Sequence, residues 1–438
     1  MKNLFRYTIT LFVATALCLT TACNKDKPEY PFPIPGNDTP TPTPPQEITT
    51  SHTLMFYFVG TTLNQEFAGN LTSTEEALKE LSKKGGVLYG KTSRPRVIVY
   101  KQKSRSVAHI FELKYSDGEC VKDTLATYNT PAAMPAENVT AYLNKMMELA
   151  PAPSYGLVIG SHSRGWTPIE AEDWTRSIAG IGGGSAAPYW QVAPGALVTR
   201  FLGEGYPYYN SYSPGHSNFF DIWDLADALE ATQQKFKYII YDACLMANVE
   251  TLYDLRNCSE YAIASVSEIM GIGFPYKTVI PHLLGDNGAS FNLDGVCEAY
   301  NYYYKVHGNR SGSVSLVDNS QLEALAEATK AALNETPQME VEEKELQYYD
   351  GLKPHLYYDF GQYINAVCPE GEVKEAFNAQ LAKSVPCKYT LSYFYTGLEP
   401  NPGNHKINTE AYSGLATSLP SGKYRTEYPE TSWYKATH

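Results

Sequence analysis

The sequence predicts an α/β fold in which a mostly parallel sheet is flanked by helices, followed by a C-terminal α+β extension. Short apolar runs alternate with amphipathic segments between residues 53 and 266, and this alternation is typical of parallel strands joined by helices. Beyond residue 276 the chain becomes mainly helical, with two further strand candidates. We therefore expect one core over residues 51–310 and an extension over residues 311–438 that packs on it.

Each element is predicted from its apolar periodicity and its terminal residues. Uninterrupted apolar runs of strand length are typical of strands buried on both faces, and apolar residues three and four positions apart are typical of helices. Pro135 begins one helical segment, at a position where a backbone N–H has no helical partner. Strands are expected over 53–59, 96–101, 107–113, 156–161, 238–244, 262–266, 313–317 and 388–395. Helices are expected over 63–81, 135–149, 221–232, 279–285, 295–306, 321–334, 358–367 and 373–382.

The first 23 residues predict a bacterial lipoprotein signal peptide. Lys2 and Arg6 precede an apolar run over 9–19, which is too short to span a bilayer as a permanent helix. Small residues then precede Cys23, which predicts lipidation of Cys23; an ordinary signal peptide cut nearby is the alternative. Residues 24–50 hold eight prolines and predict an extended tether. The expected location is the bacterial cell envelope, lipid-anchored at the outer membrane and facing the periplasm or the surface.

The composition of the 438 residues limits the partners that the protein can bind and indicates the redox state of its cysteines. A formal charge of −12 argues against nucleic acid, whose phosphates require a basic surface. Six of the eight cysteines remain once Cys18 and Cys23 are set aside, and they are widely spaced without a Cys-x-x-Cys pair. Although an exported chain makes disulfides an alternative, we expect these six to be mostly buried thiols.

Two apolar strands each deliver one reactive residue. The run from Tyr238 predicts a buried strand that ends on Cys244, and the run over 156–161 is followed by His162. In open parallel sheets, ligands bind outside the carboxyl ends of the strands. A cysteine nucleophile requires a nearby imidazole, which is adjacent in space rather than in sequence. The pattern predicts a Cys–His peptidase with peptide or protein substrates.

Other interpretations of these two residues are structural. A cysteine at a strand end is often a small buried hydrophobe, and a loop histidine can simply be hydrogen-bonded in place. The remaining histidines show no metal-ligand spacing, so no metal site is predicted. A Ser-His-Asp hydrolase is a poor third interpretation, because the chain has no Gly-x-Ser-x-Gly elbow.

Three blocks of this chain resemble the clostripain family, within the caspase-like clan of cysteine peptidases. The family carries a strand end His-Gly-x-Gly-Trp and a later strand end Asp-Ala-Cys-Leu-Met. Here these read His162-Ser163-Arg164-Gly165-Trp166 and Asp242-Ala243-Cys244-Leu245-Met246. A third block, over 264–276, is similar to the family's Ser-rich strand end and the Gly-x-Gly loop that follows it. The resemblance implies a caspase-like sheet and an endopeptidase.

The resemblance also implies roles for several residues. His162 and Cys244 form the catalytic pair, and the backbone N–H groups of Ser163 and Cys244 stabilise the oxyanion. Asp242 lies at the base of the pocket for the residue before the scissile bond and selects Arg or Lys. Ser265 and Glu268 complete the substrate-binding residues. Glu268 is expected to compensate for Ile272, which stands where relatives often carry a second acid, and calcium is a cofactor in some relatives.

One departure from the family pattern keeps a second function open. Ser163 stands where the family usually has Gly, and Arg164 beside it is unusual. A backbone N–H survives the change to Ser, whereas the added Cβ can crowd the site. The alternative is therefore a catalytically inactive relative that binds peptides or glycans at the envelope.

A long insertion over 167–218 separates the two catalytic strands. It is rich in Gly, Pro, Ser and aromatic residues, and long loops of this kind are usually functional. Because many relatives of the family cut themselves between the His and Cys motifs, the insertion predicts self-cleavage. Arg176, which precedes a small residue and a glycine run, is the favoured position, and Arg200 is the second choice. A plain surface loop in an uncut chain is the alternative.

Overall fold

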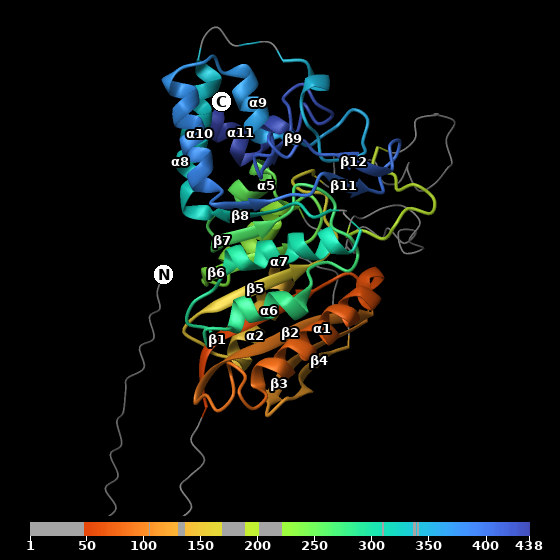
Figure 1. Cartoon of the computed structure of the whole chain (residues 1–438), viewed down its shortest axis with the longest axis vertical. Coiled ribbons are helices and arrows are strands. Elements are labelled where there is room, and N and C mark those ends of the chain that lie inside the picture. Colours follow the sequence, from red (N-terminus) through yellow and green to blue (C-terminus); the bar gives the residue numbers. More distant parts are fainter. Residues whose placement is uncertain are drawn as a thin grey trace, which may run out of the picture. The chain divides into compact units, whose positions relative to one another are not determined.

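The computed structural model describes residues 48–104, 106–129, 136–168, 189–200, 221–308, 311–335, 339 and 341–438. Its centre is a nine-stranded sheet with the strand order β10-β8-β7-β6-β5-β1-β2-β3-β4 (Figure 1). The strands are β1 (Thr49–Phe58), β2 (Ser93–Ser104), β3 (Val107–Ser116), β4 (Glu119–Tyr128), β5 (Tyr155–Gly160), β6 (Phe236–Asp242), β7 (Ser259–Ala264), β8 (Val314–Asp318) and β10 (Cys387–Tyr389).

The five central strands, from β2 to β7, are mutually parallel, and the pairs at both edges are antiparallel. The predicted fold, a mostly parallel sheet flanked by helices, is confirmed. Every residue of β5 is buried, as expected for a strand covered on both faces.

Helices cover both faces of the sheet. Successive side chains of β1 point to opposite faces, so β1 has aromatic contacts on each. Phe56 and Phe58 contact Tyr276 of α6 (Tyr276–Leu284). Tyr57 between them stacks on Tyr100, which in turn contacts Tyr142 of α2. The first face is covered by α1 (Asn64–Ser82), α6 and α7 (Leu293–Val306), and α2 (Ala136–Leu149) packs against α4 (Ile222–Glu230).

The C-terminal part of the chain adds strands to the sheet and builds a helical layer beyond it. β8 pairs with β7, and β10 pairs with β8. The helical layer contains α8 (Leu322–Asn334), α9 (Phe360–Val367), α10 (Glu372–Ser384) and α11 (Ser432–Thr437). Two small sheets lie in the same part of the chain, one formed by β11 (Tyr393–Thr396) with β12 (Gly403–Lys406) and one by β9 (Tyr358–Asp359) with β13 (Ala416–Thr417).

Several sequence expectations differ from these elements. The single strand expected over 388–395 is wrong: β10 and β11 lie in different sheets. β4 is an edge strand with no buried residue and no apolar run, so its sequence lacked the expected signal. β6 ends at Asp242, so Cys244 lies in the turn after the strand rather than in it.

The six cysteines of the described chain are free, four of them buried and two partly exposed. Among the described residues, no helix is both long and apolar enough to cross a membrane. The predicted signal peptide, Cys23 and most of the predicted tether lie outside the described residues, and β1 begins at Thr49. Arg176 also lies outside them, as do residues 169–188 and 201–218 of the predicted insertion.

Candidate active site

The register between β5 and β6 brings His162 and Cys244 to the same edge of the sheet. Gly160, the last residue of β5, pairs with Asp242, the last residue of β6. His162 and Cys244 each follow two positions after that pair. Because neighbouring strands lie about 4.8 Å apart, the two loops leave the sheet side by side. The N–H of Ser161 still donates to the Asp242 carbonyl, at 3.4 Å.

The turn after β6 holds Cys244 in a buried and constrained position. Leu245 has φ 60°, a left-handed conformation that is uncommon for a residue with a side chain and is often found at functional sites. Its N–H donates to the carbonyl of Ser267 at 3.2 Å. The Cys244 sulfur accepts from the N–H of Ile269 at 3.2 Å. Burial raises the pKa of the Cys244 thiol well above its usual range, and Glu268 adds to the shift.

The loop after β5 positions the imidazole. Nε2 of His162 lies 2.7 Å from the hydroxyl oxygen of Thr62. Burial lowers the pKa of His162 to about 4, and the charge of Arg200 acts in the same direction, so the ring is neutral near pH 7. Gly165 has φ +70°, and a Cβ there would lie 2.6 Å from the side-chain nitrogen of Asn248. Only glycine therefore fits this bend of the histidine loop.

Residues 198–200, from the predicted insertion, pair with residues 269–271 through one isolated antiparallel bridge. The N–H of Arg200 donates to the carbonyl of Ile269 at 2.7 Å, and the N–H of Gly271 donates to the carbonyl of Val198 at 2.8 Å. Thr199 and Met270 form an antiparallel bridge. This segment of the chain has the backbone hydrogen bonding that an extended peptide makes when it adds to a strand.

The Arg200 guanidinium enters a buried pocket. Its Nη1 lies 3.0 Å from Oδ2 of Asp242, and both side chains are fully buried. Nη1 also donates to the Asp242 carbonyl at 3.0 Å, and Nη2 donates to Oδ1 of Asn70 at 2.7 Å. Burial raises the pKa of the Asp242 carboxyl, and the charge of Arg200 opposes that rise. The hydroxyl of Tyr276 donates to the same carboxylate at 2.6 Å.

The walls of this pocket come from segments far apart in the chain. The guanidinium carbon lies 5.2 Å from the centre of the Phe67 ring. Gly273, with φ +66°, also lines the pocket: a Cβ there would lie 2.5 Å from Oδ1 of Asp242 and would overlap the guanidinium. Phe67 and Asn70 stand one turn apart on α1, and both are buried.

The Arg200 carbonyl reaches the predicted catalytic residues. The N–H of Ser163 donates to this oxygen at 3.2 Å, and the oxygen also acts as a hydrogen-bond partner of His162. The Ser163 hydroxyl lies 2.9 Å from the Met246 sulfur and accepts from the N–H of Gly165 at 3.0 Å. The serine side chain is thus engaged within its own loop.

The other two predicted substrate-binding residues lie apart from the guanidinium. Ser265 is buried and its hydroxyl lies 3.1 Å from that of Ser313. Glu268 accepts from the hydroxyls of Thr199, at 2.6 Å, and Thr396. Burial raises the pKa of Glu268 to about 7. In the described contacts, Glu268 therefore binds the residue before Arg200, and it does not compensate for Ile272 as expected.

Sequence reasoning missed several residues of the site. Asn70 is a polar residue on the apolar face of α1, and this is the one local signal that was available. Thr199 and Thr396 carry no comparable signal, whereas Gly273 belongs to the Gly-x-Gly loop of the third block. Arg164, which is unusual beside Ser163 in the family pattern, lies with its guanidinium carbon 5.3 Å from the centre of the Trp190 ring.

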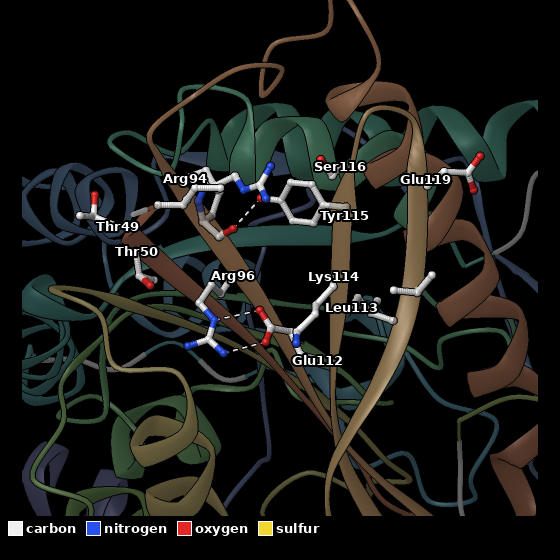
Figure 2. A pocket seen from close by; sticks show the side chains of 13 residues that line it. Thr49, Thr50, Arg94, Arg96, Glu112, Leu113, Lys114, Tyr115, Ser116 and Glu119 are labelled. Carbon is white, nitrogen blue, oxygen red and sulfur yellow. Dashed lines mark hydrogen bonds and ion pairs between the residues drawn. The ribbon is translucent and has the colours of Figure 1, made fainter. Parts of the chain in front are cut away.

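A cavity of about 450 Å³ lies elsewhere (Figure 2). It is lined by the beginnings of β1 and β2, and Arg96 forms a two-point ion pair with Glu112 there. These are the amino ends of the parallel strands, at the opposite edge from Cys244. Within the part of the chain that the structure describes, no group of three or more metal-binding side chains is found.

Comparisons with known proteins agree with the motifs. The sequence profile of the clostripain family matches residues 210–371. A secreted C11 cysteine protease from Bacteroides thetaiotaomicron is 27% identical, with a TM-score of 0.71 over 89% of this chain and 100% of its own. An inactive zymogen C11 protease from Parabacteroides distasonis is 26% identical, with a TM-score of 0.68 over 89% of this chain and 99% of its own. No curated protein matches the chain.

Proposed function

We propose that this chain, which the sequence profile of the clostripain family matches over residues 210–371, is an endopeptidase that cleaves after Arg or Lys and first cuts itself after Arg200. The position of Arg200 carries this proposal. Its guanidinium is paired with Asp242, and its carbonyl accepts from the N–H of Ser163. A substrate residue before a scissile bond needs both contacts. Arg200, the second choice from the sequence, thus replaces Arg176 as the proposed self-cleavage site.

The reaction uses a thiol and an imidazole that are both uncharged before the attack. The Cys244 sulfur attacks the carbonyl carbon of Arg200, and the thiol proton passes to the neutral ring of His162. The carbonyl oxygen becomes negative and is stabilised by the N–H groups of Ser163 and Cys244. The carbon–nitrogen bond after Arg200 then breaks, and His162 gives its proton to the leaving amine. Water, deprotonated by His162, hydrolyses the thioester and restores the thiol.

The occupied cleft also explains how the uncut chain is held inactive. Cys244 is fully buried, so its sulfur is out of reach of an external peptide. Arg200 fills the pocket that an external substrate requires. We propose that cutting after Arg200 allows this segment to leave and frees the pocket for other peptides.

The alternative, an inactive peptide- or glycan-binding relative, rested on Ser163. Support for activity comes from the backbone, because the Ser163 N–H faces the Arg200 carbonyl and the hydroxyl contacts Met246 instead. The added Cβ leaves this donor in place. Arg164 contacts Trp190 rather than the pocket carboxylate.

Self-processing tests the proposal directly. Wild type, Cys244→Ala, Arg200→Ala and Arg176→Ala are purified and compared on a denaturing gel, with N-terminal sequencing of each fragment. We expect two fragments from wild type and from Arg176→Ala, with a new terminus at residue 201, and an intact chain from the other two. An intact wild type that still cleaves peptides would contradict self-cleavage, and a wild type that cleaves neither would contradict the enzymatic function.

We also propose that the protein is anchored in the bacterial envelope through lipid on Cys23. The support is the sequence alone: a charged start, an apolar run and small residues before the cysteine. Mass spectrometry of the mature N-terminus tests this, since a diacylated cysteine at residue 23 is expected. An unmodified terminus at another residue would reject lipidation.

A further inference from the structure

Thr199, the residue before Arg200, is hydrogen-bonded to a second buried acid, Glu268. The Thr199 hydroxyl donates to Oε2 of Glu268 at 2.6 Å, and both residues are buried. We propose that Glu268 forms a second specificity subsite that selects threonine or serine immediately before the basic residue. This inference rests on the proposed function, in which residues 198–200 lie in the cleft as a substrate does.

The hydrogen bonds of Glu268 leave one place for a substrate hydroxyl. The Oε1 atom accepts from the Thr396 hydroxyl and from the N–H of Gly397, the latter at 3.0 Å. The Oε2 atom accepts from Thr199. With a pKa of about 7, Glu268 is mainly ionised only above neutral pH, and the ionised carboxylate, which only accepts hydrogen bonds, requires a donor from the substrate. An isosteric valine would leave a buried acceptor without a partner, which costs more than an ordinary hydrogen bond contributes.

The surroundings of Glu268 favour a short side chain. The Thr396 hydroxyl accepts from the N–H of Leu398 at 3.1 Å. The turn over 396–398 is therefore held by a hydrogen bond of its own as well as by Glu268. A Cβ added at Gly397 would lie 3.3 Å from the Cβ of Ala196 and 3.9 Å from Oε2 of Glu268. The C-terminal extension thus covers the Glu268 carboxylate. The space that remains beside it fits a side chain as short as threonine.

Selection is confined to two positions of the substrate. Val198 is 49% exposed and Leu197 is 41% exposed, so their side chains project toward solvent. The guanidinium of Arg200 is bound by Asp242 and Asn70. The cleft therefore selects a substrate with a hydroxyl residue followed by a basic residue. It selects little among the residues that precede these two.

Fluorogenic peptides that differ only in the residue before arginine test this inference. Threonine, serine, valine and alanine are compared on the processed enzyme, with leucine in place of arginine as a control for the pocket. We expect kcat/KM for threonine to exceed that for valine by about tenfold to hundredfold, with serine nearer to threonine. Equal rates for threonine and valine, with arginine still required, would overturn this inference alone. Absence of cleavage of every peptide would overturn the proposed function and this inference with it.

A variant of Glu268 tests whether this residue is the one that selects threonine. Glu268→Met keeps the length of the side chain but removes the acceptor, so the ratio of threonine to valine should fall to near one. The preference for arginine over leucine should stay, which shows that the pocket remains folded. A variant that still prefers threonine would assign the selection to another residue and overturn the role of Glu268. Should the variant fail to fold, the wild-type series still decides between the outcomes.

Discussion

The Arg200 guanidinium lies 3.0 Å from the Asp242 carboxylate, with both side chains fully buried. Burying two charges is expensive, and such pairs often contribute little net stability. Asn70 and Tyr276 supply further hydrogen bonds to the pair, which offset part of that cost. A buried pair of this kind supports the proposal that this pocket binds a basic residue.

Asp242→Asn should lower kcat/KM for arginine peptides by about a hundredfold or more. The substitution keeps the shape of the side chain and removes its charge, so a guanidinium entering the pocket is left without a counter-ion. The measurement compares Arg, Lys, Leu and Asp before the scissile bond. Glu260→Asn, a change to a surface acid that pairs with Lys237, serves as the control. An arginine preference unchanged in Asp242→Asn would show that another group selects the basic residue.

Asn70→Ala should reduce the preference for arginine over lysine by about tenfold or more. Asn70 contacts Nη2, the nitrogen that the shorter lysine amine does not supply, while Asp242 contacts Nη1. The loss of one hydrogen bond to a charged group is worth about 1.5 kcal/mol or more. Kinetics on matched arginine and lysine peptides measure the ratio, and Asn64→Ala, at the start of the same helix, is the control. A parallel loss for both peptides would point to a general effect on the fold.

Gly273→Ala should abolish both self-cleavage and cleavage of arginine peptides. The new Cβ would occupy the space of the guanidinium and approach Oδ1 of Asp242 to 2.5 Å. Gly85→Ala is the matched control, because Gly85 also has a positive φ but has open space around it. Thermal unfolding of both variants separates backbone strain from a blocked pocket. Normal processing by a folded Gly273→Ala would contradict the geometry of the pocket.

Glu250 should make the folded state less stable as the pH rises. Burial raises its pKa to about 7, above the usual value of about 4.5, so the folded state holds this proton more tightly. The contribution is fully present below pH ~4.5 and is lost as the pH rises through about 7, amounting to about 3 kcal/mol at ~1.4 kcal/mol per pKa unit.

Glu250→Gln in a Cys244→Ala background isolates that effect. Denaturant unfolding at pH 5 and pH 8 should show the Gln variant gaining stability relative to its parent at the higher pH. Glu327→Gln, at an exposed position on α8, provides the control. The same pH dependence in the Glu250→Gln variant and its parent would show that this carboxyl does not titrate as described.

The sequence by itself determined the sheet and the edge of it at which His162 and Cys244 lie. Apolar runs of strand length around Val158 and Ile240 predicted β5 and β6, because strands buried on both faces need continuous apolar sequence. Parallel strands bring their carboxyl ends to one edge, so His162 and Cys244 could be placed together without a structure. The family motif supplied Asp242, which the structure places beneath the Arg200 guanidinium.

Only the tertiary structure decided that Arg200 fills the pocket and that Asp242 and Glu268 bind successive residues of the same segment. Asn70, Arg200 and Thr396 lie far from Cys244 in the chain, and their contacts depend on how α1, the segment before residue 201 and the C-terminal extension pack. No local pattern encodes such contacts, because each arises from distant segments that become neighbours only on folding. For the same reason the choice between Arg176 and Arg200 was open in the sequence, whereas the buried contacts of Arg200 favour it in the folded chain.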